Sequence, residues 1–306
     1  MPFPLRTSEL NLTLNATQSV TKSHALSDLP DGYRVKNWKV VMEGDFTYAV
    51  GATDKTPEFA ASAFSKVEAS ILDEAHKVNL SGQELAQVYV NRHGERFGNT
   101  FVADAGNTSE NRIETIWEPI PPMGGELDWN SRIPTGLIGE NDHLKVTYTL
   151  NDFAAELTAF SGVVYIEAMV DFFDGEYIPS TSEQKSISNI EGDLLKIPGK
   201  LATIIVRNRD FERVDMDGLY MRCDAGDLDR MGHKHWEPLR SDGERTTRVN
   251  ILKSTLGTTL GGGELAFCTL FDRRDHKLFE GAGKWKFEGL PTSNGGYIQH
   301  TYQGLV

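Results

Sequence analysis

The chain has 306 residues, 39 % of them hydrophobic and 25 % charged, and its formal net charge is −13. This composition is typical of a folded protein of about two domains, and no apolar stretch is long enough to cross a membrane as a helix. The acidic balance argues against sequence-independent binding to nucleic acid, which requires clustered Lys and Arg.

The first 25 residues are predicted to form an N-terminal arm outside any barrel core. Pro2 and Pro4 lack the N–H groups that a strand ladder uses, and the polar stretch 11–19 offers little apolar area. A frayed terminus is the alternative explanation. The start of the chain also lacks the basic and apolar regions of a secretory signal, so we expect no secretory route.

Most of the remaining chain consists of short β-forming runs separated by Gly and Pro. The runs are rich in β-branched and aromatic residues with a period of two, which is typical of antiparallel sandwiches and barrels. They occupy residues 33–41, 144–150, 162–172, 201–206, 264–271 and 284–288.

Residues 56–78 are ambiguous between a helix and a strand. Apolar residues recur at helical spacing from Phe59 to Val78, whereas the run beginning at Phe64 also fits a strand. An internal repeat decides in favour of the strand at residues 67–71, because the similar segment at 213–220 ends in an Asp-Gly turn flanked by strand formers.

That repeat extends over both halves of the chain. Residues 64–68 resemble 211–215, residues 79–85 resemble 224–228, and residues 29–35 resemble 197–201. Residues 144–167 match 265–288 without gaps, at a constant offset of 121 (265 − 144). The order is the same in both halves, which predicts one all-β unit written twice, with domains at 26–178 and 179–306.

Two groups of residues could bind metal. His233 and His235 would share one face of a strand, but no further ligand stands at a recognisable spacing, so solvated or edge histidines are the better interpretation. The acidic residues near the Asp217-Gly218 turn have some ingredients of a calcium loop, without its alternation. These are Asp215, Asp217, Asp224, Asp227 and Asp229. We expect no cofactor, and leave an adventitious or interface calcium ion open.

No pattern predicts an active site. The glycines 261–263 lack the Gly-Lys-Ser/Thr ending of a phosphate-binding loop, and no nucleophile signature surrounds any Ser or Cys. Cys223 and Cys268 are expected to be small core residues. We therefore predict no catalytic, cofactor-binding or metal-binding residues, and a protein that is not an enzyme.

The order of these segments resembles that of a known family. A strand at 33–41 is followed by Val67-Glu68 and a turn, then by residues 80–85 and by residues 91–94. The closing half has a strand, residues 275–278, a Gly-containing turn and paired strands. This order resembles the double jelly-roll major capsid proteins of icosahedral, membrane-containing bacterial viruses, particularly the corticovirus-like branch.

The resemblance implies a structural protein made of two eight-stranded antiparallel jelly-roll barrels in tandem. It implies a homotrimer that forms a pseudo-hexameric capsomer, located in the virion and, during assembly, in the host cytoplasm. Expected partners are other copies of the chain, a penton or spike protein and an internal viral membrane, with no direct binding of nucleic acid. Residues 92–140 are expected to form an extended loop at the top or interface of the capsomer.

Two other classes remain open. A phage receptor-binding or spike protein is also β-rich and trimeric, but it normally has a Gly-rich or coiled-coil stem, which the sequence lacks. A carbohydrate-binding or carbohydrate-hydrolysing β-sandwich requires a Trp or Tyr platform with paired carboxylates. The five tryptophans are spread over both halves, which favours core packing over a platform.

Overall fold

The computed structural model describes the N-terminal half more fully than the C-terminal half. In the first half it describes residues 2–7, 9–15, 18–26, 32–71, 76–93, 97–118, 132–135, 144–150 and 156–172. In the second half it describes the backbone of strands β11 to β18. The chain divides into two compact units, one of residues 1–90, 95–119 and 129–177, and one of residues 91–94, 120–128 and 178–306.

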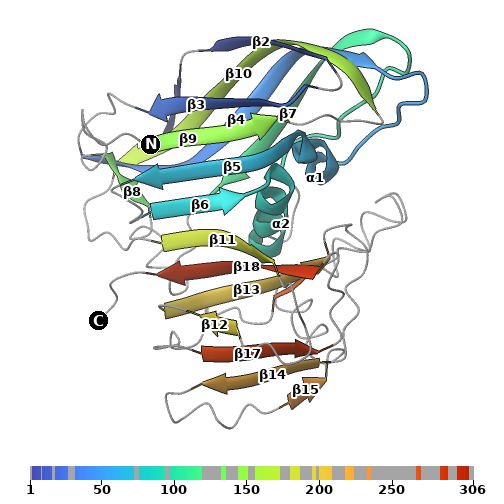
Figure 1. The fold of residues 1–306 in the computed structure, drawn as a ribbon. Helices are drawn as coiled ribbons and strands as arrows, with labels where there is room; N and C mark the ends of the chain where they lie inside the picture. The colour runs from blue at the N-terminus through green and yellow to red at the C-terminus, as the bar shows by residue number, and fades with distance from the viewer. Residues whose placement is uncertain are drawn as a thin grey trace. The chain divides into compact units, whose positions relative to one another are not determined.

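One sheet of the first unit contains β1 (Phe3–Arg6), β2 (Leu10–Asn15), β4 (Tyr33–Tyr48), β7 (Thr108–Trp117), β8 (Ile133–Pro134) and β10 (Leu157–Phe172). The long strand β10 pairs on one side with β1 and β2 in succession, and on the other side with β4, which in turn pairs with β7 (Figure 1). All of these pairs are antiparallel, and the short β8 pairs with the start of β4.

The second sheet of this unit contains β3 (Val20–Leu26), β5 (Phe64–Ile71), β6 (His76–Leu80) and β9 (Leu144–Leu150), paired antiparallel in the order β6-β5-β9-β3. Before β5 come the short helix α1 (Pro57–Ala60) and the 3-10 turn η1 (Ala61–Ala63). The strand prediction for residues 67–71 is confirmed, and the helical spacing before it corresponds only to these short turns.

The helix α2 (Gly82–His93) follows β6 and begins with a capping box. The Ser81 N–H donates to the Glu84 carboxylate at 2.7 Å, and the Glu84 N–H donates to the Ser81 hydroxyl at 3.2 Å. This reciprocal pair satisfies two donors that a helix N-terminus otherwise leaves open.

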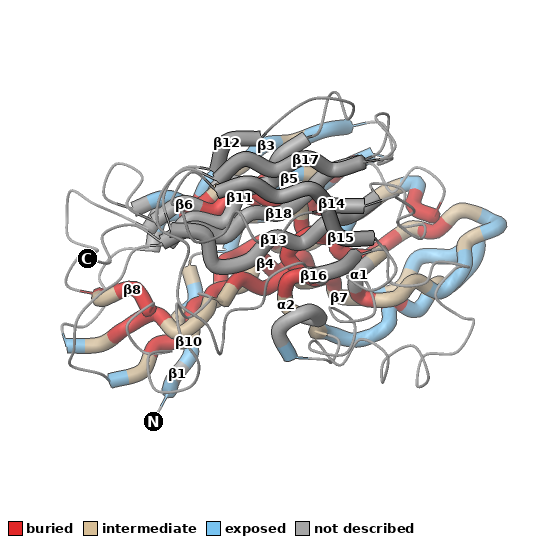
Figure 2. The backbone as a smooth tube through the Cα atoms, turned by 90° about the horizontal axis from the view of Figure 1, so that it is seen from below, coloured by how far each residue is buried: buried red, intermediate tan, exposed pale blue. Residues whose placement is uncertain are grey.

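The core of the first unit follows from period-two alternation along its long strands. On β4, Trp38, Val40 and Phe46 are fully buried, whereas Lys39 and Glu43 occupy the opposite face. Trp38 stacks on Trp117 of β7 with ring centroids 5.7 Å apart, and both are buried. Figure 2 shows buried segments along β4, β7 and β10. For these two tryptophans the prediction of core packing is confirmed.

Apart from the last residues of α2, the described part of the second unit consists of strands. They are β11 (Ser180–Ser186), β12 (Leu195–Ile197), β13 (Lys200–Asn208), β14 (Gly218–Cys223), β15 (His233–His235), β16 (Phe267–Thr269), β17 (Gly283–Glu288) and β18 (Gly295–Tyr302). One antiparallel set has the order β11-β18-β13-β16, and the other has the order β12-β17-β14-β15.

The two units repeat one pairing scheme. When the strands of the two units are matched by their order along the chain, their neighbours in each sheet also match. The order β11-β18-β13-β16 corresponds to β1/β2-β10-β4-β7, and the order β12-β17-β14-β15 corresponds to β3-β9-β5-β6. The predicted all-β class and duplication of topology are confirmed. The residue register of the duplication is wrong, however, because pairing equates β9 and β10 with β17 and β18, whereas the 121-residue offset equates them with β16 and β17. The count of eight strands per barrel stays a prediction.

The predicted N-terminal arm is also wrong, because residues 3–26 form three paired strands. Pro4 is compatible with β1 because, among the described strands, β1 pairs with β10 only. The Thr7 N–H donates to the Ile166 carbonyl at 2.9 Å, and donors toward β10 alternate along the strand, so the nitrogen of Pro4 faces away from β10. Leu12 and Leu14 are buried between exposed polar residues.

The expected long loop at residues 92–140 is interrupted by regular structure. It contains the end of α2, the ten-residue strand β7 and the short strand β8. In addition, Phe101 is fully buried and forms a β-bridge with Lys55. Residues 119–131 of this stretch, including residues 120–125, lie outside the described residues.

Candidate assembly surface

One face of the β1-β10-β4-β7 sheet in the first unit carries a connected set of charges. The side chains that point to this face come from alternate positions on four strands, opposite the buried residues of the same strands. We call it the charged sheet face; it consists of Arg6, Lys39, Glu43, Arg112, Glu114, Tyr165 and Glu167.

The charges of this face are paired with one another. Lys39 lies 2.6 Å from Glu167 and 3.6 Å from Glu114, and Arg112 lies 2.7 Å from Glu114. Glu167 also lies 3.6 Å from Arg6. Three cationic and three carboxylate side chains therefore balance, and the face offers no net positive charge that would attract phosphate.

Tyr165 lies at the centre of this face. Its hydroxyl donates to Glu43 at 2.9 Å, and the Arg6 guanidinium lies 4.2 Å above its ring, a cation–π distance. Burial and the hydrogen bond to Glu43 raise the pKa of Tyr165 to about 12. For Glu167, burial opposes ionisation, but the hydrogen bond and charge of Lys39, with the charges of Arg6 and Arg112, lower its pKa. Tyr165 thus stays a neutral hydrogen-bond donor at neutral pH, and Glu167 stays ionised to a lower pH than a free carboxyl group.

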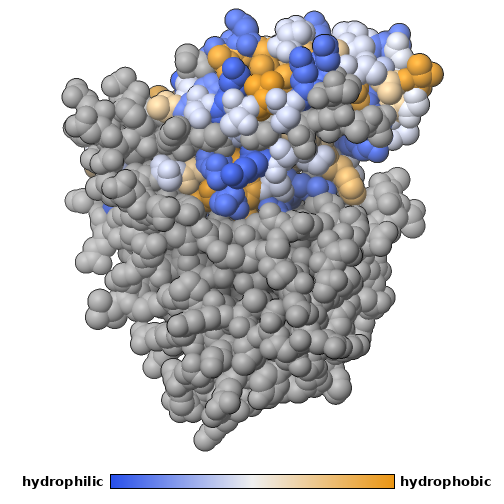
Figure 3. Space-filling view, viewed as in Figure 1, coloured by the Kyte–Doolittle hydropathy of each residue, from blue (hydrophilic) through white to orange (hydrophobic). Residues whose placement is uncertain are grey.

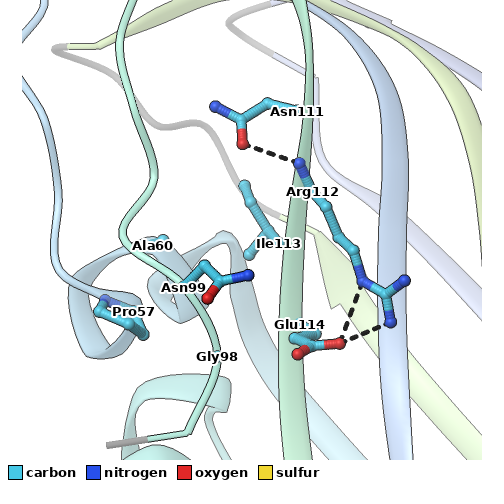
Figure 4. Close-up of a pocket in the computed structure, with 8 residues that line it drawn as sticks. All are labelled: Pro57, Ala60, Gly98, Asn99, Asn111, Arg112, Ile113 and Glu114. Atoms are coloured by element: carbon cyan, nitrogen blue, oxygen red, sulfur yellow. Dashed lines mark hydrogen bonds and ion pairs between the residues drawn. The ribbon is translucent and has the colours of Figure 1, made fainter.

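A small pocket of about 80 Å³ lies along the free edge of β7. It is lined by Pro57, Ala60, Gly98, Asn99, Asn111, Arg112, Ile113 and Glu114 (Figure 4). The Asn111 side-chain oxygen accepts the backbone N–H of Arg112 at 2.9 Å, and its amide donates to the Val102 carbonyl at 2.8 Å. Asn111 therefore covers part of the strand edge, which protects against uncontrolled strand pairing. The pocket is far smaller than a typical ligand site.

The loop after β4 is held by one carboxylate. Glu156 accepts the Thr53 N–H at 2.6 Å and pairs with Lys55 at 2.8 Å. Burial raises the pKa of Glu156, but the hydrogen bonds of Lys55 and Thr53 and the charge of Lys55 lower it more. The ordered loop presents Val50, which is 88 % exposed. On the face of the first unit in Figure 3, hydrophilic and hydrophobic residues are interspersed.

The structure places the described candidate residues on three strands of the second unit. His233 and His235 lie on β15, where they pair with Tyr220 and Gly218 of β14. Cys223 lies on β14 opposite Gly283, and Cys268 lies on β16 opposite Val206. The acidic residues at 215, 217, 224, 227 and 229 and the glycines 261–263 lie outside the described residues.

Sequence reasoning did not find the charged sheet face. Its signal was present in the alternation of charged with apolar residues on β4, β7 and β10, for example Lys39 between Trp38 and Val40.

Within the described part of the chain, no cluster of three or more His, Cys, Asp or Glu could hold a metal ion. No helix in that part is long and apolar enough to cross a membrane.

Comparison with known proteins identifies the fold. No family model and no curated protein matches the chain. Among solved structures, it is similar to the STIV MCP, with a TM-score of 0.56 at 8 % identity, over 99 % of this chain and 96 % of that one. It is also similar to a chain of the Sulfolobus Turreted Icosahedral Virus structure, with a TM-score of 0.58 at 10 % identity, over 98 % and 90 %.

The major capsid protein P2 from bacteriophage PM2 matches with a TM-score of 0.42 at 13 % identity, over 98 % of this chain and 97 % of P2. The two STIV matches cover nearly the whole chain. Their TM-scores confirm the predicted resemblance to double jelly-roll major capsid proteins for the fold, and a likeness of fold at 8 % and 10 % identity does not establish the activity.

Proposed function

We propose that this chain is a viral major capsid protein, the structural subunit of an icosahedral shell. The observation that carries the proposal is the repeated pairing scheme, in which each half of the chain has the same two strand sets, together with the likeness to the STIV MCP over the whole chain. Two similar units in one chain suit a shell subunit, because three copies approximate six-fold symmetry with only three-fold assembly.

The proposed assembly unit is a homotrimer whose repeated parts are the two barrels, with predicted bounds of 26–178 and 179–306 and with the first barrel extended toward the N-terminus by strands β1 to β3. Other copies of the chain are its main partners. A penton or spike protein and an internal viral membrane are further proposed partners, in the virion and, before assembly, in the host cytoplasm. The charged sheet face supports this role because a self-neutralised surface limits non-specific attraction.

A non-enzymatic role is part of the same proposal. The pocket at the edge of β7 is small, and the carboxylates on the adjoining face are committed to ion pairs. A carbohydrate-binding sandwich would expose an aromatic platform, but Trp38 and Trp117 are buried against each other. These observations favour a structural subunit over the sugar-binding alternative.

The test is the mass of the purified full-length chain, measured by sedimentation equilibrium across a range of concentrations and salt. The proposal expects a species of three chains at high concentration, and hexagonal arrays or shells when the protein is concentrated further. A chain that stays monomeric at every concentration and never forms ordered arrays would contradict it.

A further inference from the structure

A buried histidine links the two sheets of the first unit. His24 on β3 is 8 % exposed, and its Nε2 lies 3.0 Å from the Tyr148 hydroxyl on β9. Its Nδ1 lies 3.3 Å from the hydroxyl oxygen of Thr7, which belongs to the segment between β1 and β2. The His24 and Tyr148 rings stack with centroids 5.6 Å apart. Both ring nitrogens therefore have partners, one toward each sheet.

Thr7 carries this link to the backbone of β10. Its N–H donates to the Ile166 carbonyl at 2.9 Å, and its hydroxyl oxygen accepts the Ile166 N–H at 3.0 Å. At this point a side chain replaces a backbone acceptor in the ladder that joins the N-terminal segment to β10. The hydrogen bonds thus run from β10 through Thr7 and His24 to Tyr148.

We propose that His24 fastens the N-terminal strands β1 and β2 to β10 at neutral pH and releases them in acid. A neutral imidazole donates from one ring nitrogen and accepts at the other, whereas an imidazolium donates from both. In either tautomer, protonation turns the accepting nitrogen into a second donor, so the hydroxyl of Thr7 or of Tyr148 must rotate to accept from it. The ring then carries a positive charge in a site where it is 8 % exposed, and separating residues 3–15 from β10 relieves this cost by giving the ring access to water.

The surroundings of His24 disfavour the charged form. Lys22 lies on the same face of β3, opposite Tyr148, and Tyr148 is the only titratable side chain among the described residues that contacts the ring. Phe64 packs edge-on against Tyr148 on the other side. Burial lowers the pKa of His24 below its ordinary 6.5. The unfolded or opened chain therefore binds the proton more tightly, so the attachment is complete above pH 6.5 and weakens as the pH falls below it.

The strands that would be released lie at the edge of the described sheet. β1 has four residues and includes Pro4, and among the described strands both β1 and β2 pair with β10 only. The sheet beyond them, β10-β4-β7, is held by long ladders and the Trp38–Trp117 stack. The opening is therefore local to residues 3–15, and it depends only on the fold of the first unit.

The experiment is hydrogen exchange with peptide-level mass spectrometry on the full chain at pH 7.5 and pH 5.5, corrected for intrinsic exchange rates. We expect residues 3–15 and 159–170 to exchange faster in acid, by up to about tenfold, because pH 5.5 lies one unit below the ordinary pKa of 6.5 that His24 takes in the open state. Residues 38–46 of β4, which pairs with the other side of β10, should keep their protection at both values.

Two variants and one control make the result specific. His24→Gln keeps a polar side chain that does not titrate, so the protection of residues 3–15 in this variant should not depend on pH. His93→Gln, at the exposed end of α2, is the control and should behave like the wild type. Thr7→Val, which keeps the shape and removes the hydroxyl, should raise exchange of residues 3–15 already at pH 7.5. Equal wild-type protection at both pH values, or acid loosening that persists in His24→Gln, would overturn the proposal.

Discussion

The strongest structural prediction concerns a glycine pair in the middle of the two longest strands. Gly44 of β4 lies directly opposite Gly162 of β10. A Cβ on Gly44 would lie 2.6 Å from both the Gly162 Cα and the Ser161 carbonyl oxygen, and Gly44 has a φ of +150°. Because these neighbours are backbone atoms of a paired strand, they cannot move away as a flexible side chain could.

The expected cost of Gly44→Ala has two parts. Overpacking against a fixed backbone costs about 1–3 kcal/mol, and a backbone conformation that only glycine adopts readily costs about 1–3 kcal/mol more. A loss of about 2–6 kcal/mol is a large fraction of the stability of an ordinary domain, about 5–15 kcal/mol. Gly162→Ala should also destabilise, because its Cβ would lie 2.2 Å from the Glu43 carbonyl oxygen. The double variant should cost less than the sum, because both methyl groups require the same strand separation.

The assay is urea unfolding followed by tryptophan fluorescence, which reports on the buried Trp38–Trp117 stack. Gly51→Ala is the matched control, because its Cβ would meet nothing within 4 Å, and it should change the free energy of unfolding by less than about 0.5 kcal/mol. If Gly44→Ala is as mild as Gly51→Ala, the close approach of β4 and β10 at this pair is refuted.

Two further predictions concern single interactions in the first unit. Ser81→Ala removes half of the capping box at α2 and should lower the free energy of unfolding, measured by urea titration, by about 1 kcal/mol. Ser70→Ala, on the exposed face of β5, is the control and should leave this free energy unchanged. Equal effects of the two substitutions would contradict the capping role. The lowered pKa of Glu156 means that its stabilising interaction is present above the carboxyl's ordinary pKa and is lost as the pH falls through its folded value. Stability should therefore fall as the pH drops below about 4.5, and Lys55→Met should flatten that fall. An unchanged pH profile in Lys55→Met would show that Glu156 draws its stabilisation from elsewhere.

The all-β class and the duplication could be read from the sequence because period-two alternation is local. The register of the duplication could not, because every antiparallel strand carries the same alternation. A shift by one whole strand, from β17 and β18 to β16 and β17, therefore keeps residue types matched while exchanging the strand partners. Only the pairing of β10 with β4 and of β18 with β13 distinguishes the two alignments.

The N-terminal strands were missed for a different reason. Leu10, Leu12 and Leu14 alternate with polar residues, which is a strand signal. The prolines and the many Asn and Thr residues of the same segment favour an irregular arm instead. An edge strand tolerates Pro where its nitrogen faces outward, and that depends on register, which is a tertiary property. The charged sheet face also depends on register, because Arg6, Lys39, Arg112 and Glu167 become neighbours only when four strands align.

The most direct test of the proposed function is electron microscopy of the assembled particles from which the protein comes, with the position of this chain located by antibody labelling. The account predicts that the label covers the faces of an icosahedral shell, and that each pseudo-hexagonal capsomer holds three copies of the chain. Label confined to the vertices or to a tail, or capsomers built from six copies, would contradict it.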